Sequence, residues 1–208
     1  LMWIAGMPLF DSVCHSFGTV ATGGFSTQND SIAGYSPVIQ YIVTFFMLIA
    51  GMNFSLHFLL FTGRGRQMWK NEEWRFYLII IFGVVALLTV TLFLKMGMPL
   101  EAAFRDASFQ VVTIITATGF ATDDYLLWPI YGQLLIAMLM LIGASAGSTG
   151  GGVKVIRHLV ALKKIRHSFR RLIYPNAVSH VRYNGRVLDA EQVSGIIGFI
   201  IFYYLILV

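Results

Sequence analysis

A stretch of 23 residues occurs twice in this chain and constrains the fold more than any other feature. Residues 5–27 read AGMPLFDSVCHSFGTVATGGFST, and residues 100–122 read LEAAFRDASFQVVTIITATGFAT. A shift of 95 positions superposes identical residues: Asp11 on Asp106, Gly24 on Gly119, Phe25 on Phe120 and Thr27 on Thr122. Each copy is a mostly uncharged amphipathic run followed by a small-residue tract ending in Gly-Phe, and a long hydrophobic segment comes next. This pattern predicts two re-entrant pore helices, each followed by an extended filter strand.

Composition indicates a membrane protein. Of the 208 residues, 57% are apolar and only 12% are charged, against about 25% charged residues in an ordinary soluble domain. The formal net charge is +5, and most Lys and Arg residues fall within residues 64–75 and 154–171, directly after long apolar segments. Clusters in such places are cytoplasmic anchors under the positive-inside rule. The basic balance therefore does not indicate a nucleic-acid partner.

Each pore helix is too short to cross a bilayer. A helix from Pro8 to Val20 would be about 20 Å long at 1.5 Å per residue, whereas the hydrocarbon core is about 30 Å thick. We therefore expect it to enter and return, with an extended strand over residues 21–27. The second copy places the equivalent helix at residues 100–115 and its strand at 116–122.

Two uncharged segments are long enough to span the bilayer. Residues 37–61 contain no Asp, Glu, Lys or Arg, and residues 76–94 form a second such run. Each predicts a membrane span. Gly51, Asn53 and His57 lie in the second half of the first run. They mark an ion path or serve close helix packing and interhelical hydrogen bonding.

A third hydrophobic segment, residues 126–142, begins another span and ends in ten small residues, GASAGSTGGG, at 143–152. Gly in a helix costs about 1 kcal/mol relative to Ala, and irregular backbone at membrane depth is tolerated only against protein or a water-filled cavity. We expect the helix to break here, facing the pore, and to resume near Val153. A nucleotide-binding loop is rejected, because Val153 stands where its Lys is needed.

The C-terminal part is expected to be cytoplasmic before it re-enters the membrane. Residues 154–171 are amphipathic and basic, which predicts a helix at the inner membrane face or beyond it. Asn184 and Gly185 stand between short alternating runs and predict a type I′ hairpin. Asp189 and Gln192 give a start signal for a last helix, which we expect to run outward from residue 194.

The predicted fold class is an all-α polytopic membrane protein, built from repeated helix, pore loop and helix units. Its parts are a pore loop with an inner helix, a cytoplasmic connector, a complete repeat containing the glycine-rich loop, and a cytoplasmic hairpin with the start of another repeat. These parts cover residues 1–61, 62–75, 76–171 and 172–208.

The small-residue tracts carry the chemistry. A dehydrated cation needs a ring of oxygens, which backbone carbonyls supply where the side chains point away. Gly permits backbone conformations closed to other residues, and a pore helix C-terminus adds about half a negative elementary charge directed at the cavity. The candidate filter residues are Thr22, Gly23, Gly24, Phe25, Ala117, Thr118, Gly119 and Phe120, with both Phe side chains packing outward as cuffs.

Four carboxylates have two possible roles. Asp11 and Asp106 occupy equivalent positions on the pore helices, where they either concentrate cations at the outer mouth or cap and pair locally. Asp123 and Asp124, just beyond the second tract, have a similar claim. The sequence offers no catalytic triad, metal-ligand spacing or pair of catalytic carboxylates, so we do not expect an enzyme.

Three motifs carry a family resemblance: TVATGGFSTQNDS, ITATGFATDDY and GASAGSTGGGVKVIRHL. They resemble the Trk, Ktr and HKT superfamily of potassium-uptake membrane proteins over nearly the whole chain. In that superfamily, four repeats surround one pore and each keeps one filter Gly, which here would be Gly24 and Gly119. The resemblance implies that this sequence holds the second repeat from its pore loop onward, all of the third, and the start of the fourth.

The resemblance also implies ligands, partners and location. Potassium ions would bind at the filter residues, with no other cofactor. A loop that plugs the pore below the filter would be the gate, formed by Gly143, Ala144, Ser145, Ala146, Gly147, Ser148, Thr149, Gly150, Gly151 and Gly152. The protein would be a multi-pass homodimer in the bacterial inner membrane, with a pore in each subunit. A cytoplasmic nucleotide-binding regulatory ring (TrkA-like) would contact residues 154–171 and the hairpin at 180–189.

Two alternatives remain open at the level of sequence. In a two-pore-domain-type potassium channel, two chains of two repeats build one four-part filter. A repeat-built, cation-coupled secondary transporter would instead bind its substrate at the membrane midplane and alternate access to it. The repeats of such transporters are often inverted, whereas both pore loops here are predicted to enter from the same side.

Overall fold

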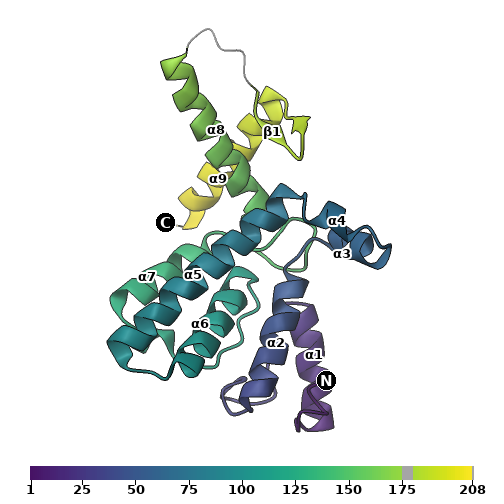
Figure 1. Cartoon of the computed structure of the whole chain (residues 1–208), viewed down its shortest axis with the longest axis vertical. Helices are drawn as coiled ribbons and strands as arrows, with labels where there is room; N and C mark the ends of the chain where they lie inside the picture. The colour runs from purple at the N-terminus through teal and green to yellow at the C-terminus, as the bar shows by residue number, and fades with distance from the viewer. Residues whose placement is uncertain (175–179, 208) are drawn as a thin grey trace.

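The computed structural model describes residues 1–174 and 180–207 and consists mainly of helices (Figure 1). At one end, two helical groups lie side by side: α1 (Leu9–Val20) with α2 (Pro37–Ala50), and α5 (Glu72–Met96) with α6 (Leu100–Ile115) and α7 (Ile130–Met140). The other elements are α3 (Phe54–Phe61), α4 (Gly65–Met68), the 3-10 turn η1 (Tyr125–Leu127), α8 (Val155–Ile173), β1 (Arg182–Tyr183), β2 (Arg186–Val187) and α9 (Ala190–Leu207).

The two predicted pore helices are present as α1 and α6. Pro8 and Pro99 precede them with φ of −52° and −53°, close to the value that the proline ring imposes. The helices end at equivalent positions, Val20 and Ile115, and α6 has the predicted bounds. The loop after α1 and the turn before α6 lie at the same end of the molecule, away from α4 and α8 (Figure 1). Both pore loops therefore enter from one side, as predicted.

Residues 37–61 do not form the continuous span that their uncharged run predicts. α2 and α3 meet at an angle of 101°. Close packing at the break explains the Gly at position 51, because a Cβ there would lie 2.5 Å from the Tyr77 hydroxyl oxygen. The Asn53 side chain accepts a hydrogen bond from the Ser55 N–H (2.8 Å) and so caps a new helix. Hydropathy does not register such a cap, so the uncharged run gave no sign that the helix is broken.

α5 is longer than the predicted run of residues 76–94 at both ends. The Asn71 side chain caps its N-terminus, and Gly97 ends it with a φ of 65°. Among the described residues, α5 and α9 are long and apolar enough to cross a membrane, and α2 with α3 adds a third crossing if the bent pair counts as one span. α7 has only 11 residues, or about 16 Å, so it does not cross by itself.

The helix break after α7 and the hairpin follow the predictions. No helix covers residues 141–154, and α8 resumes at Val155. Asn184 and Gly185 have φ of 47° and 79°, the two positive values that a type I′ turn requires. α9 starts at Ala190, four positions before the predicted residue 194. The predicted part 172–208 includes residues 175–179 and 208, which lie outside the described residues.

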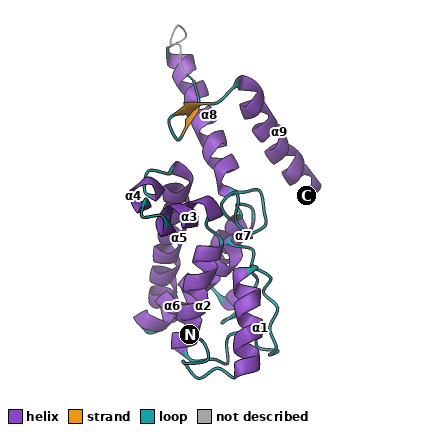
Figure 2. Cartoon of the chain, turned by 90° about the vertical axis from the view of Figure 1, so that its right-hand side faces the viewer, coloured by secondary structure: helices purple, strands orange, loops and turns teal. Residues whose placement is uncertain are grey.

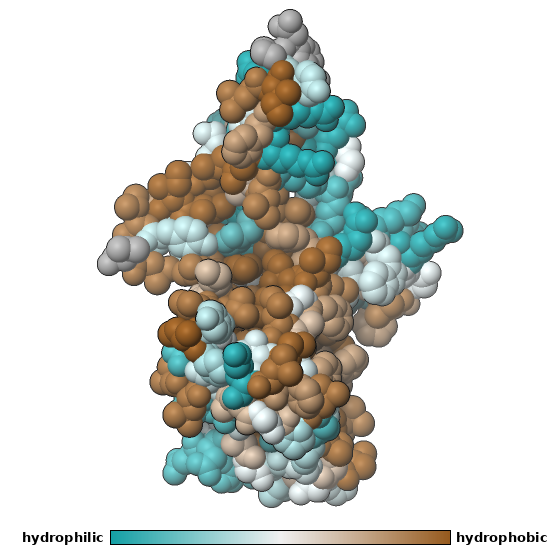
Figure 3. All heavy atoms as spheres, turned by 60° about the vertical axis from the view of Figure 1, so that its left-hand side comes forward, coloured by the Kyte–Doolittle hydropathy of each residue, from teal (hydrophilic) through white to brown (hydrophobic). Residues whose placement is uncertain are grey.

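The main hydrophobic core lies where α5 and α6 pack together and against α2 and α7. Its largest fully buried side chains include Tyr77, Leu88, Leu92, Phe109 and Ile115. A smaller cluster of Val160, Val181 and Val193 joins α8 to the hairpin and α9. These elements lie toward the end of the molecule opposite to the N-terminus (Figure 2). Apolar side chains cover much of the middle of the surface, and polar ones gather toward its ends (Figure 3).

Candidate functional site

The two small-residue tracts share one backbone conformation. Thr22 and Gly24 have φ of 51° and 67°, and their equivalents Ala117 and Gly119 have φ of 56° and 90°. The residue between them has a negative φ in both copies. The tracts are therefore not the extended strands that the sequence predicted. Alternation of left- and right-handed φ can direct successive carbonyl groups to one side, whereas in an extended strand they point to alternate sides.

The same backbone hydrogen bonds anchor each tract to its own pore helix. The N–H groups of Ala21, Thr22 and Gly23 donate to the carbonyls of Phe17, Thr19 and Gly18 at 2.9, 3.3 and 2.8 Å. The N–H groups of Thr116, Ala117 and Thr118 donate to the equivalent carbonyls of Val112, Ile114 and Thr113 at 3.1, 3.0 and 2.9 Å. The N–H groups of both tracts thus face their helices, which leaves the carbonyl groups to face elsewhere.

Six carbonyl oxygens of the two tracts accept no hydrogen bond from any described residue. They belong to Thr22, Gly23, Gly24, Ala117, Thr118 and Gly119. These oxygens are free to bind water or a cation, and three of them, those of Gly23, Ala117 and Gly119, belong to exposed residues. The two tracts also adjoin each other, because a Cβ on Gly24 would lie 1.9 Å from the Thr118 carbonyl oxygen.

The two filter Phe side chains lie in different surroundings. Phe120 is 1% exposed and packs on α1, where its ring centroid lies 5.6 Å from that of His15 and its Cζ would lie 3.1 Å from a Cβ on Gly18. Phe25 is 85% exposed. The packing predicted for both side chains is therefore found for Phe120 and not for Phe25.

Asp11 ties the outer end of the first tract to the pore helix. Its carboxylate accepts hydrogen bonds from Thr27 Oγ1 (2.6 Å), the Tyr35 hydroxyl (3.0 Å) and Gln28 Nε2 (3.4 Å). These bonds, led by the one from Thr27, hold the pKa of Asp11 below its ordinary value. Of the two roles considered for this residue, local pairing is the one that the geometry supports.

The equivalent Asp106 has a weaker attachment. Its Oδ1 lies 3.6 Å from Arg105 Nε, while Arg105 also pairs with Glu101 at 2.9 Å. Burial raises the pKa of Asp106, and the neighbouring Arg105 opposes that rise. The carboxylates beyond the tract have local partners as well: Asp123 accepts from Trp128 Nε1 at 2.7 Å, and Asp124 from the Leu126 N–H at 3.0 Å.

The glycine-rich loop, residues 143–152, lies under both pore helices. Thr149 Oγ1 donates to the Val20 carbonyl (3.1 Å) at the end of α1 and to the Ala50 carbonyl (3.3 Å) at the end of α2. A Cβ on Gly150 would lie 2.7 Å from the Thr116 carbonyl oxygen at the end of α6. The loop is therefore in direct contact with the helix ends that carry partial negative charge.

The break between α2 and α3 holds the same loop. The Ser145 N–H donates to the Gly51 carbonyl (3.1 Å), and Asn53 Nδ2 donates to the Ala146 carbonyl (2.5 Å). His57 instead bonds the Ile49 carbonyl at 3.1 Å, within its own broken segment. Of the roles considered for these positions, the structure shows packing and hydrogen bonding.

Sequence reasoning missed Glu73, which holds the loop from the other side. This residue is 2% exposed, and its Oε1 accepts a 2.6 Å hydrogen bond from the Ala146 N–H. Its Oε2 lies 3.5 Å from the Tyr183 hydroxyl in the hairpin. Burial raises the pKa of Tyr183 to about 12, so the hydroxyl keeps its proton and donates. Glu73 stands among other polar residues in the sequence, and no hydrophobic periodicity or motif indicates that its carboxylate is buried.

Glu72, the preceding residue, binds the hairpin and α8. Its Oε2 pairs with Lys163 Nζ at 2.6 Å and accepts from the Asn184 N–H at 2.9 Å. Asn184 Oδ1 accepts in return from the Glu72 N–H at 2.9 Å. Two adjacent carboxylates therefore connect the hairpin and α8 to the glycine-rich loop.

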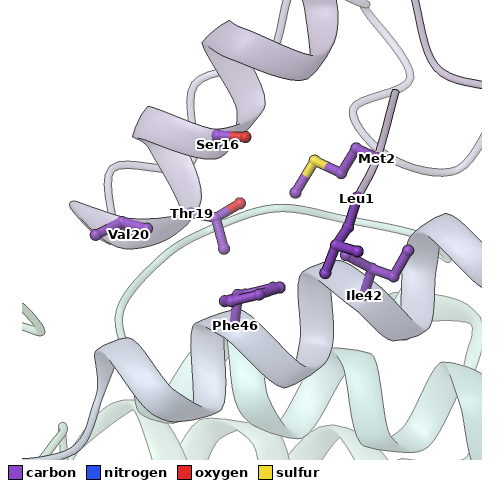
Figure 4. A pocket seen from close by; sticks show the side chains of 7 residues that line it. All are labelled: Leu1, Met2, Ser16, Thr19, Val20, Ile42 and Phe46. Atoms are coloured by element: carbon purple, nitrogen blue, oxygen red, sulfur yellow. The ribbon is translucent and has the colours of Figure 1, made fainter. Parts of the chain in front are cut away.

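A cavity of about 210 Å³ between α1, α2 and the first residues is lined mainly by apolar side chains (Figure 4). Its lining includes the hydroxyls of Ser16 and Thr19, and both donate to backbone carbonyls of their own helix at 2.6 Å. Its remaining side chains are apolar: Leu1, Met2, Val20, Ile42 and Phe46.

Comparison with known proteins gives a consistent set of relatives. Residues 2–208 match the profile of the TrkH family, described as cation transport protein. The Trk system potassium uptake protein TrkH of Escherichia coli K12 is 39% identical over 210 residues, which cover 100% of this chain and 44% of that protein. TrkH of Vibrio parahaemolyticus is 38% identical over 99% of this chain and 44% of its own length.

A solved structure agrees with these sequences. The crystal structure of the potassium transporter TrkH from Vibrio parahaemolyticus superposes with a TM-score of 0.93 at 36% sequence identity, and the match covers 98% of this chain and 44% of that one. The chain therefore spans less than half the length of the relatives that it matches.

Proposed function

Since the chain belongs to the TrkH family of cation transport proteins, we propose that it is the part of a potassium-uptake protein that supplies two of its filter tracts and its gate. The proposal rests on one observation above all: the two tracts repeat the same alternating φ and leave the same carbonyl oxygens without a hydrogen-bond donor among the described residues. Relatives covering the whole chain are named as potassium uptake proteins. The membrane would be the bacterial inner membrane.

Potassium suits this arrangement. Uncommitted carbonyl oxygens replace the hydration shell of a cation, and the C-termini of α1 and α6 add negative potential below them. The proposed potassium ligands come from the tracts Thr22, Gly23, Gly24 and Phe25, and Ala117, Thr118, Gly119 and Phe120. Other parts of the full-length protein would complete the ring of oxygens. Pore loops that enter from one end favour this reading over a transporter with inverted repeats.

We propose that the glycine-rich loop, Gly143 to Gly152, is the gate. It bonds the Val20 carbonyl directly below the first tract, where it would obstruct an ion leaving the filter. Gly143, Gly147 and Gly152 have φ of 80°, 70° and 82°, which suits a segment that changes between conformers at little cost. Passage of an ion would require the loop to release its bonds to the helix ends.

Glu72 and Glu73 would connect this gate to a cytoplasmic regulator. The proposed partner is a nucleotide-binding ring that binds the hairpin and α8, in a homodimer with one pore per subunit. A displaced hairpin would act on Glu72 through Asn184 and on Glu73 through Tyr183. Because Glu73 holds the Ala146 N–H, such a displacement would be felt by the loop.

Rubidium uptake into liposomes containing the full-length protein tests the filter. The variant Gly119→Ser places a side chain at a φ of 90° in open space. Gly83→Ser is the matched control, because a Cβ at that helical position also meets nothing within 4 Å. We expect wild type and the control to take up rubidium with block by potassium rather than sodium, and Gly119→Ser to lose that preference. Uptake with unchanged selectivity in Gly119→Ser would overturn the filter assignment.

The variant Glu73→Gln tests the gate. It keeps the shape of the side chain but weakens a charge-assisted hydrogen bond, which contributes about 1.5–3 kcal/mol. We expect rubidium uptake without a regulatory partner to rise about tenfold and to depend less on that partner when it is added. Glu101→Gln is the control, because Glu101 lies in the first turn of α6. It should leave both the rubidium uptake and its dependence on the partner unchanged. If Glu73→Gln behaves like this control, the loop is not held shut by Glu73.

A further inference from the structure

Two neighbouring cavities adjoin α8: one lies between α8, the hairpin and the start of α9, and the described lining of the other comes from α8 alone. One has a volume of about 300 Å³ and the other of about 490 Å³. Lys164 and His167 line both, so the two are neighbours, and together we call them the basic groove. It lies well away from the filter tracts and the glycine-rich loop, at the end of the molecule where α8 and α9 cross (Figure 1).

The basic groove has a cationic wall and an apolar floor. Its nitrogen-bearing side chains are Lys164, His167, Arg171 and His180. Its apolar side chains are Val181, Leu188, Val193, Ile197 and Leu172. No Asp or Glu is among the described residues that line it. A ligand that satisfies both surfaces has to be anionic at one part and apolar at another.

Neighbouring lysines show that the positive charge of the groove is not neutralised from within. Lys163 pairs with Glu72 at 2.6 Å. Lys164, next to it, and Arg171, two turns further on, form no ion pair with a described residue. Two like charges held on one helix face repel each other, and an anion placed between them removes that repulsion.

The surroundings of the groove are those of a membrane interface. α9, which begins beside the groove, is apolar and long enough to cross a membrane. α8 exposes Leu162, Ile165, Phe169 and Leu172 at 52, 52, 63 and 77%. Basic residues on an amphipathic helix beside a membrane span attract anionic lipids of the cytoplasmic leaflet.

We propose that the basic groove binds an anionic phospholipid, with Lys164 and Arg171 on its phosphate and Ile197 and Leu172 against the first part of its acyl chains. This site is separate from the proposed potassium path, and it borders the surface of α8 and the hairpin to which the proposed regulatory ring would bind. Inorganic phosphate has the same anionic chemistry but would make no contact with Leu172, which is 77% exposed, or with Ile197, at the edge of the Val160, Val181 and Val193 cluster. The choice of a lipid therefore depends on the floor as well as on the charges.

Native mass spectrometry of the full-length protein, delipidated in detergent and titrated with short-chain phosphatidylglycerol, measures this binding. The double variant Lys164→Gln, Arg171→Gln removes both charges. Arg66→Gln, Lys70→Gln is the matched control, because those side chains are also basic and exposed but belong to the connector. A basic residue near an anionic lipid surface contributes about fivefold in affinity. We expect the groove variant to bind about 25-fold more weakly and the control to bind within twofold of wild type.

Three comparisons decide between sources of binding. Phosphatidylcholine, which has the phosphate but no net charge, should bind at least tenfold more weakly than phosphatidylglycerol. Inorganic phosphate should not displace the lipid at equal concentration. Ser168→Glu, which adds an acid at the groove without removing a native contact of the basic residues, should weaken binding as the double variant does. Equal binding of both lipids, displacement by inorganic phosphate, or wild-type affinity in either groove variant would overturn the proposal.

Discussion

The helices that carry the two tracts, α1 and α6, differ in how deeply they are buried and in which helices they contact. Of the 12 residues of α1, four are buried, whereas α6 buries ten of 16. α6 packs against α2, α5 and α7, while α1 has α2 as its main helical neighbour. Both tracts nevertheless keep the same signs of φ and the same anchoring bonds. The conformation of the two tracts therefore follows from the local backbone pattern and is compatible with different surroundings.

The two loops also differ at an equivalent position on their helices, where one has Thr113 and the other has Gly18. In the second loop, Thr113 Oγ1 accepts from the Gly119 N–H at 3.1 Å and donates to the Phe120 carbonyl at 2.9 Å. Its equivalent in the first loop is Gly18, which makes no such bonds and instead leaves room for the Phe120 ring. The second loop thus has a side chain, Thr113, that stabilises its own tract. In the first loop, Gly18 leaves space into which Phe120 of the second loop packs.

The comparison predicts the largest effect at the two filter glycines. Gly24→Ala would place a Cβ 1.9 Å from the Thr118 carbonyl oxygen at a φ of 67°, whereas Gly119→Ala meets only the strain of a φ of 90°. A left-handed conformation costs Ala about 1–2 kcal/mol, and a packing clash adds about 1–3 kcal/mol. We expect rubidium uptake to fall roughly 100-fold or more in Gly24→Ala and about tenfold in Gly119→Ala. Equal losses would mean that the tracts do not adjoin.

A smaller difference is expected at the two filter Phe residues. Phe120→Ala removes a ring that is 1% exposed, and Phe25→Ala removes one that is 85% exposed. The first should lower the free energy of unfolding by about 3–5 kcal/mol, and the second by no more than about 0.5 kcal/mol. Thermal denaturation of the full-length protein, followed by fluorescence-detected size exclusion, gives the order of the two. A lower melting temperature for Phe25→Ala than for Phe120→Ala would contradict the asymmetry.

The smallest difference concerns the equivalent carboxylates. Asp11→Asn loses the charge that three donors share, so we expect a drop in melting temperature. Asp106→Asn removes only a 3.6 Å ion pair from a carboxyl whose pKa burial already raises. Its effect should stay within about 1 kcal/mol. The same melting assay at neutral pH measures both variants. A larger drop in melting temperature for Asp106→Asn would show that Asp106, and not Asp11, contributes more to stability.

Much of the fold could be predicted because its signals are local. Pro99 and the small residues after Ile115 bound α6, the ten small residues break the helix after α7, and Asn184 with Gly185 makes the hairpin turn. Each depends on a backbone property that neighbouring residues supply. The family resemblance read from the same motifs is confirmed by the relatives found.

The rest depended on contacts between distant segments. The Gly at position 51 is required by Tyr77, 26 positions away, and uncharged composition gives no sign of that contact. Glu73 contacts Ala146, 73 positions further along the chain. The two tracts were expected to be extended. Small residues allow many backbone conformations, so the sequence did not indicate the alternating φ that the tracts adopt. The roles of the filter and gate residues stay predictions.

Anomalous scattering from rubidium in crystals of the full-length protein tests the central claim most directly, because it locates the ion rather than its flux. We expect peaks within coordination distance of the uncommitted carbonyl oxygens of Thr22 and Gly23 in the first tract and Ala117 and Thr118 in the second. An excess of potassium should remove those peaks. Rubidium bound elsewhere, with the two tracts unoccupied, would contradict that claim.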